Sequence, residues 1–264
     1  MSLSGIDIAG KGIGGIGAII YREMRLFFGD MGTVILSLIS PLIYMFFFSA
    51  SLGQMMPLLS YNGVQATYIE FVLPGILAMT SLNSALMTSQ SVFNEKLSNM
   101  LLEILSTPVQ HKAYMIGKIT ASTVLGVFQS ILMFACGILV FGVPISLYTF
   151  LGILLIDIVV CLTMSGFYMT VMGLVNDFRT FILTCNILSS VIMFGSPIFY
   201  PVEQIPAGLQ VIAKANPVTY CCDAVRSFFL LGKVPSEIML LTCCLAVVFT
   251  GTAVMVFAKR FREV

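Results

Sequence analysis

Hydrophobic residues occur along this chain in long stretches, separated by short segments that carry nearly all of the charged side chains. Residues 31–69, 71–94 and 119–156 contain no Asp, Glu, Lys or Arg. An α-helix needs about 20 apolar residues to cross the hydrocarbon core of a membrane. A strand of a membrane barrel needs only about 10, so uncharged intervals of this length favour helices.

The hydrophobic pattern predicts an all-α polytopic membrane protein that forms a single transmembrane domain over residues 1–264. The turn-like sequence Gly142-Val143-Pro144 separates two of the apolar stretches and divides one long interval into two helices. The six predicted transmembrane helices cover residues 33–52, 71–92, 118–141, 148–175, 180–199 and 237–258.

Composition supports a membrane protein and excludes several other classes. Hydrophobic residues make up 58% of the chain and charged residues 9%, whereas an ordinary soluble domain has about 25% charged residues. A net charge of +1 provides no surface for nucleic acid. The seven cysteines fall mostly in apolar runs and there is one histidine, so we expect no metal site, no catalytic residue and no cofactor in this chain. No P-loop sequence for ATP hydrolysis occurs either.

The positions of the lysines and arginines predict the orientation in the membrane. Ten of the thirteen flank one side of the predicted helices, and only Lys214, Arg226 and Lys233 fall on the other side. Basic residues concentrate on the cytoplasmic side of membrane proteins. We therefore expect a multi-pass protein of a prokaryotic cytoplasmic membrane with both termini in the cytoplasm.

Two short segments on the predicted cytoplasmic side have amphipathic patterns. Residues 16–28 place isoleucines and phenylalanines on one face and Arg22 and Glu23 on the other, which predicts an interfacial helix or a cytoplasmic extension of the first span. Residues 94–107 predict a second helix whose apolar stripe requires a cover, either lipid or a partner protein. The stripe contains Leu97, Leu101, Ile104 and Leu105, and the charged residues are Glu95, Lys96 and Glu103.

The last outer loop, residues 200–231, is rich in apolar residues although it lies between two predicted spans. A solvated loop is normally polar, so we expect two short helices here that dip back toward the membrane. Asp223 and Arg226 are three residues apart and could pair on one face of such a helix.

Polar residues inside the predicted spans are candidates for a translocation pathway. Asp157 is the one acidic residue deep within a span, and charges at such depth are commonly functional. Thr80, Ser84 and Thr88 form a stripe on the second predicted helix. Close helix packing is the alternative interpretation of that stripe, and a packing hydrogen bond is the alternative for Asp157.

Several motifs then resemble a known family, the membrane permease subunits of type-2 ABC exporters, and specifically the branch of drug-resistance and nodulation-factor (lipo-oligosaccharide) exporters. One is the segment Glu103 to Val109, EILSTPV. Upstream of it the sequence departs from the family, with Asn99-Met100 in the region where the family often has Gly-Thr. Another starts at Gly195-Ser-Pro197. Residues 41–44 and 72–75 also fit. The outer motif consists of Gly195, Pro197, Pro201, Pro206, Asn216, Pro217, Tyr220 and Arg226.

The resemblance implies a transport complex of several subunits. This chain would pair with a second permease, identical or different, and with two copies of an ABC ATPase that bind ATP and Mg²⁺. Residues 94–107 would be the coupling helix that docks on the ATPase, through Glu95, Lys96, Leu101, Glu103 and Ile104. Residues 16–28 would be a connecting helix and residues 200–231 re-entrant outer helices.

The resulting hypothesis is a permease that exports an amphipathic substrate, such as a drug, a lipid or a lipid-linked oligosaccharide, with energy from the separate ATPase. The alternative is a channel or a membrane enzyme that acts without an ATPase.

Overall fold

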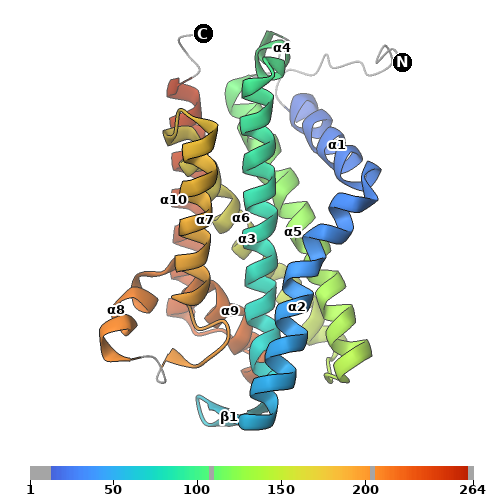
Figure 1. The fold of residues 1–264 in the computed structure, drawn as a ribbon, viewed down its shortest axis with the longest axis vertical. Helices are drawn as coiled ribbons and strands as arrows, with labels where there is room; N and C mark the ends of the chain where they lie inside the picture. Colours follow the sequence, from blue (N-terminus) through green and yellow to red (C-terminus); the bar gives the residue numbers. More distant parts are fainter. Residues whose placement is uncertain (1–12, 107–109, 203–205, 261–264) are drawn as a thin grey trace.

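The computed structural model describes residues 13–106, 110–202 and 206–260, and this part of the chain is almost entirely helical (Figure 1). Within it, five helices are long and apolar enough to cross a membrane, in agreement with the predicted all-α membrane class. They are α2 (Met31–Met55), α3 (Tyr68–Leu97), α5 (His111–Phe141), α6 (Leu147–Leu174) and α10 (Ser236–Arg260).

The segment predicted as a sixth span, residues 180–199, forms a shorter helix. This helix, α7 (Phe178–Phe194), has 17 residues. It ends where Gly195 is followed by Ser196 and Pro197, because a proline has no N–H to continue the helical hydrogen bonds. Residues 195–201 continue as an irregular segment instead of a further helical turn.

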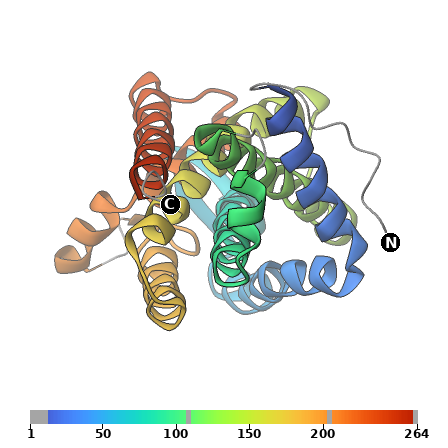
Figure 2. The same cartoon turned by 90° about the horizontal axis from the view of Figure 1, so that it is seen from above.

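Helix α3 is the central element of the bundle and contacts α2, α5, α6, α7 and α9 (Figure 2). It is the least hydrophobic of the five long helices and also the most buried. Its hydroxyl groups bond within the protein, whereas the helices around it present apolar side chains outward. This distribution suits a protein in lipid, where a polar group is stable only beside another polar group.

The two ends of the bundle carry different small elements. Helices α1 (Ile13–Gly29) and α4 (Met100–Ser106) lie at one end, together with the last turns of α10 (Figure 1). The opposite end carries the hairpin of β1 (Leu58–Tyr61) and β2 (Val64–Thr67) and, from much later in the chain, α8 (Ala207–Ala215) and α9 (Pro217–Leu231).

Sequence reasoning did not predict the hairpin. Asn62 and Gly63 form its turn with positive φ angles of 48° and 85°, a geometry that Asn-Gly pairs favour between antiparallel strands. The strands pair Leu59 with Ala66, and both side chains are buried. The Asn-Gly pair is the sequence feature that indicates a hairpin turn, but it lies within the uncharged interval 31–69, whose apolar residues predict a transmembrane helix.

The range 94–107, predicted as one helix, is divided in the structure. Residues 94–97 complete α3, and the hydroxyl of Ser98 donates to the Asn94 carbonyl at 3.0 Å. Asn99 then adopts a left-handed φ of 59°, which Asn tolerates better than most residues. The chain turns there and α4 begins at Met100, while Thr107 lies outside the described residues.

The packed face of α1 includes two residues of the predicted apolar face and one residue predicted for the polar face. Ile19, Glu23 and Phe27 are buried at intervals of four residues, so Glu23 lies on the packed face rather than the polar one. The reason is the partner that Glu23 meets there, the side chain of Lys118 on α5.

Arg226 of α9 holds the irregular segment after α7 against the bundle. Its side chain is 1% exposed. Nε donates to the Phe71 carbonyl at 3.0 Å, and Nη2 donates to the Pro197 carbonyl at 2.7 Å. Asp223 lies 3.5 Å from Nη1, as the sequence suggested, and the guanidinium stacks 3.8 Å from the centre of the Phe71 ring. One side chain thus joins α3, α9 and residues 197–198.

We expect the substitution Arg226→Met to lower the melting temperature of the detergent-purified protein by roughly 10 °C, because carbonyl groups and Asp223 would lose a buried partner. Arg226→Lys should have an intermediate effect, since an ammonium lacks the planar set of donors. The exposed Lys233→Met is the control. Equal melting temperatures for Arg226→Met and the control would show that Arg226 is not required for this packing.

Candidate coupling end and membrane-depth polar groups

A buried cluster of charges joins α1, α3 and α5 at the end of the bundle that carries α4. The ammonium of Lys118 lies 2.8 Å from a carboxylate oxygen of Glu23 and 2.7 Å from one of Glu95. Arg22 contacts the same oxygen of Glu95 at 2.7 Å, and the hydroxyl of Tyr114 donates to the other. Two cations and two carboxylates meet here, and no net charge remains.

This cluster is stable only as a complete set. Lys118 is fully buried and Glu95 is 5% exposed, so each charge has lost its water and depends on its partners. Burial is the largest influence and lowers the pKa of Arg22, but the carboxylates of Glu95 and Glu23 together outweigh burial and raise the pKa above its ordinary value. Arg22 therefore contributes a permanent positive charge at the edge of the cluster.

The burial of Glu95 changes its predicted role. The sequence suggested Glu95 as a contact for a partner ATPase, but its carboxylate points into the cluster and is not available on the surface. Neither Glu23 nor Lys118 was among the candidate residues. The signal for Glu23 was its position four residues from both Ile19 and Phe27, which places a charge in the middle of an apolar stripe.

Helix α4 presents a small exposed surface beside this cluster. Leu101, also predicted as a contact, is 1% exposed and fixes α4 to the core, whereas Leu102 and Glu103 are exposed. Met100 is exposed as well, and its sulfur accepts a hydrogen bond from Arg22 at 3.3 Å. Of the other predicted contacts, Lys96 and Ile104 are partly exposed, and Lys96 lies 5.1 Å from the centre of the Phe93 ring.

A second polar cluster occupies the middle of the bundle. Asp157 of α6 is fully buried, and Ser81 donates to its carboxylate at 3.4 Å. No Lys, Arg or His side chain among the described residues pairs with it. Thr80 bonds Ser130 at 3.0 Å, and the hydroxyl of Ser84 donates to the Ser122 carbonyl at 2.7 Å. Thr80 and Ser84, predicted for a pathway, thus join α3 to α5 inside one subunit.

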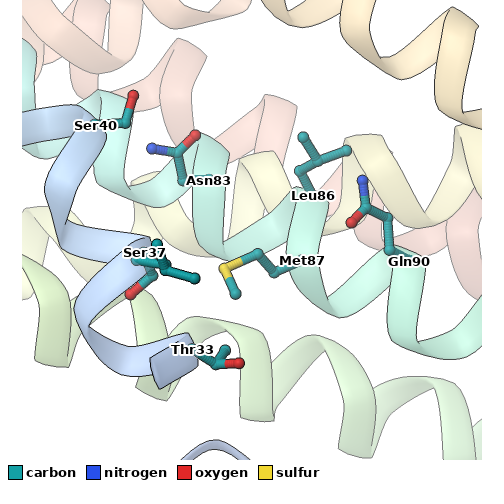
Figure 3. Close-up of a pocket in the computed structure, with 8 residues that line it drawn as sticks. Thr33, Ser37, Ser40, Asn83, Leu86, Met87 and Gln90 are labelled. Atoms are coloured by element: carbon teal, nitrogen blue, oxygen red, sulfur yellow. The ribbon is translucent and has the colours of Figure 1, made fainter. Parts of the chain in front are cut away.

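Two neighbouring cavities lie beside α3 toward the α4 end, the first between α2 and α3 and the second mainly between α1 and α3. The first has a volume of about 270 Å³ and the second about 170 Å³. They share Thr33 and Met87, and Thr88, the third residue of the predicted stripe, lines the second with Glu23 and Ser91. Figure 3 shows the first cavity, which is lined by Thr33, Leu36, Ser37, Ser40, Asn83, Leu86, Met87 and Gln90.

Comparison with known proteins identifies the family. Residues 15–230 match the family described as ABC-2 type transporter.

This chain belongs to the ABC-2 type transporter family. It is 25% identical over 168 residues to the "Probable multidrug ABC transporter permease YbhR" of Escherichia coli (strain K12), a match that covers 62% of this chain and only 44% of that protein. It is 23% identical to the "Inner membrane transport permease YadH" of the same organism, over 80% of this chain and 79% of YadH. Its identity to "Nodulation protein J" of Rhizobium meliloti (strain 1021) is 25%, over 85% and 86% of the two chains.

The outer motif by which the sequence resembled this ABC-2 family is brought together around α8 and α9. Asn216 caps α9 by accepting from the Val218 N–H, and its amide donates to the Ile192 carbonyl of α7 at 2.7 Å. The hydroxyl of Tyr220 donates to the Lys214 carbonyl at 2.6 Å. The remaining motif residues end or begin helices or lie in the irregular segment: Gly195, Pro197, Pro201, Pro206 and Pro217.

In this ABC-2 family member we expect Lys118→Met to lower the melting temperature by roughly 10 °C, because two buried carboxylates would face each other without the central cation. Adding Glu23→Gln should restore part of the loss, since Arg22 then has one carboxylate to neutralise instead of two. Differential scanning fluorimetry of the purified protein measures both.

The matched control for this series is Lys112→Met, an exposed lysine on the same helix. A double variant that is less stable than Lys118→Met alone would contradict the proposed pairing.

Proposed function

We propose that this chain is the transmembrane permease subunit of an ATP-driven ABC exporter that moves an amphipathic substrate out across the cytoplasmic membrane of a prokaryote. Membership of the ABC-2 family and the apolar helices support this proposal. The observation that carries it is the short helix α4, which is exposed at one end of the bundle, fixed by buried Leu101 and adjacent to a buried charge cluster. The name of YbhR, a probable multidrug permease, supports a drug-like amphipath as one cargo.

In this proposal the energy comes from separate subunits. Two ABC ATPase subunits bind ATP and Mg²⁺ and contact α4 of each of two permeases, through Leu102 and Glu103. Helix α7 is the sixth span, which gives an even number of crossings and puts both termini in the cytoplasm. Helix α1 lies at the cytoplasmic interface, and α8 and α9 are the re-entrant outer helices.

The contacts of α4 suggest how a push from the ATPase reaches the membrane. Two residues, Ser98 and Asn99, separate α4 from α3, and Met100 contacts Arg22 of α1. Because Glu95 and Lys118 connect the same region to α5, a displacement of α4 moves α1, α3 and α5 together as one rigid group. Coupling further requires that the two states of the complex differ in affinity for ATP or substrate.

A double substitution on α4 tests the coupling surface. Leu102→Asp with Glu103→Lys should reduce co-purification with the cognate ABC ATPase at least about tenfold, because it removes an apolar contact and reverses a charge at the centre of a small interface. Pull-down of the ATPase through a tagged permease measures the effect.

The control carries Val64→Asp and Gln65→Lys, which introduce the same two residues at exposed positions of the hairpin at the other end. Undiminished binding by the α4 variant would refute the coupling role. Absence of any ATP-binding cassette partner would favour the alternative, a channel or membrane enzyme without an ATPase.

The orientation is tested by epitope insertion at the two ends. A short tag between Asn62 and Gly63 of the hairpin should react with antibody in intact spheroplasts, whereas a tag after Ser98 should react only after permeabilisation. The reverse pattern would contradict the proposed orientation.

A further inference from the structure

Uncharged polar side chains line the larger cavity between α2 and α3, on a face that otherwise belongs to lipid. Ser37 and Ser40 of α2 face Asn83 and Gln90 of α3 across it (Figure 3). Elsewhere the outward face of α2 is apolar, with Ile35 56% and Phe47 69% exposed. The groove is therefore a polar interruption of a hydrophobic surface.

Of the five polar side chains that line this groove, two are satisfied locally: the hydroxyl of Thr33 donates to Asp30, and the hydroxyl of Ser37 donates to the Val34 carbonyl. Among the described residues, the side chains of Ser40, Asn83 and Gln90 have no hydrogen-bond partner, although each is at least partly exposed. Each amide offers two donors and one acceptor. Amides left unpaired at membrane depth are strongly destabilising, so the groove favours an occupant with hydrogen-bonding groups.

The groove has no free charge with which to hold an ion. None of its eight lining residues is charged. The neighbouring cavity contains Glu23, but its carboxylate is already neutralised by Lys118 at 2.8 Å. A charged head group would lose water here and gain no counter-charge. The occupant is therefore uncharged.

The shape and the remaining lining residues indicate an amphipathic molecule. Residues 33 and 40, like residues 83 and 90, are seven apart, which at 1.5 Å per residue gives a polar strip about 10 Å long. Leu36, Leu86 and Met87 line the same groove and provide apolar contact beside it. Pro41 has no N–H to donate to the Ser37 carbonyl, which adds one acceptor at this wall.

We propose that the groove between α2 and α3 binds an amphipath whose head group is uncharged and rich in hydrogen-bonding groups, with Asn83 and Gln90 as the residues that select it. The groove opens near the start of α2, so the ligand reaches it from the cytoplasmic leaflet. The claim that this ligand is the exported substrate rests on the proposed function. The claim that the groove binds such a ligand is tested with the permease alone, without the ATPase.

The test uses the fact that the chain contains no tryptophan. Leu36→Trp, at the exposed rim of the groove, provides a single fluorophore in protein reconstituted into phosphatidylcholine vesicles. The probe is dodecyl maltoside brominated on its alkyl chain, an uncharged amphipath whose bromine atoms quench nearby tryptophan. We expect quenching that saturates with probe concentration and that unbrominated dodecyl maltoside reverses. Leu155→Trp, 68% exposed on α6, is the control and should show only unsaturable quenching by probe dissolved in the membrane.

Substitutions in the Leu36→Trp background test the two amides. Asn83→Leu and Gln90→Leu should each weaken apparent binding about tenfold. The matched control is Asn186→Leu, an exposed asparagine on α7 outside the groove. Each variant is first checked for an unchanged elution volume in gel filtration.

Three outcomes overturn the proposal. The first is unsaturable quenching at Leu36→Trp, which is expected if water alone or a second copy of the chain covers the groove. The second is probe binding that the amide substitutions leave unchanged. The third is displacement of the probe by dodecyl phosphate or dodecyltrimethylammonium as effective as displacement by unbrominated dodecyl maltoside. Each can occur while the α4 variant still loses the ATPase, so failure of this inference is distinct from failure of the proposed function.

Discussion

The pairing of Lys118 with Glu23 and Glu95 is the constraint on which the α4 end of this protein depends. In a bundle surrounded by hydrocarbon, a buried ammonium is stable only if carboxylates meet it at short distance. Meeting two of them from different helices sets both the rotation and the depth of α1 and α3 relative to α5. Because α4 follows α3 after two residues, the position of its exposed surface follows from the same contacts.

The middle of the bundle obeys the same physical rule with hydroxyl groups in place of charges. Helix α3 can be the most polar long helix and the most buried one, because Thr80 and Ser84 find partners on α5. Lipid-facing surfaces of the other helices gain nothing from polar residues. The unpaired amides of Asn83 and Gln90 are therefore an exception, and they support binding of an amphipath with hydrogen-bonding groups in the groove.

At the opposite end, backbone carbonyls rather than carboxylates require a partner. Helix α7 stops at Phe194 and leaves an irregular segment packed among helices. Non-helical backbone in such surroundings needs buried donors. The guanidinium of Arg226 and the amide of Asn216 provide them, and this explains why polar residues recur in an otherwise apolar outer segment.

The membrane class, the approximate limits of the long helices and the family resemblance were determined by the sequence alone, since the length of an apolar run and the spacing of prolines are local properties. Only the tertiary structure decided which polar residues face one another. In the structure Glu95 and Leu101 are buried rather than exposed on the predicted coupling surface. Glu23 contacts Lys118, which is 95 positions away in the sequence, and Thr80 and Ser84 bond to α5 within the subunit. The rotation of each helix about its axis depends on its neighbours, and no pattern within one helix contains that information.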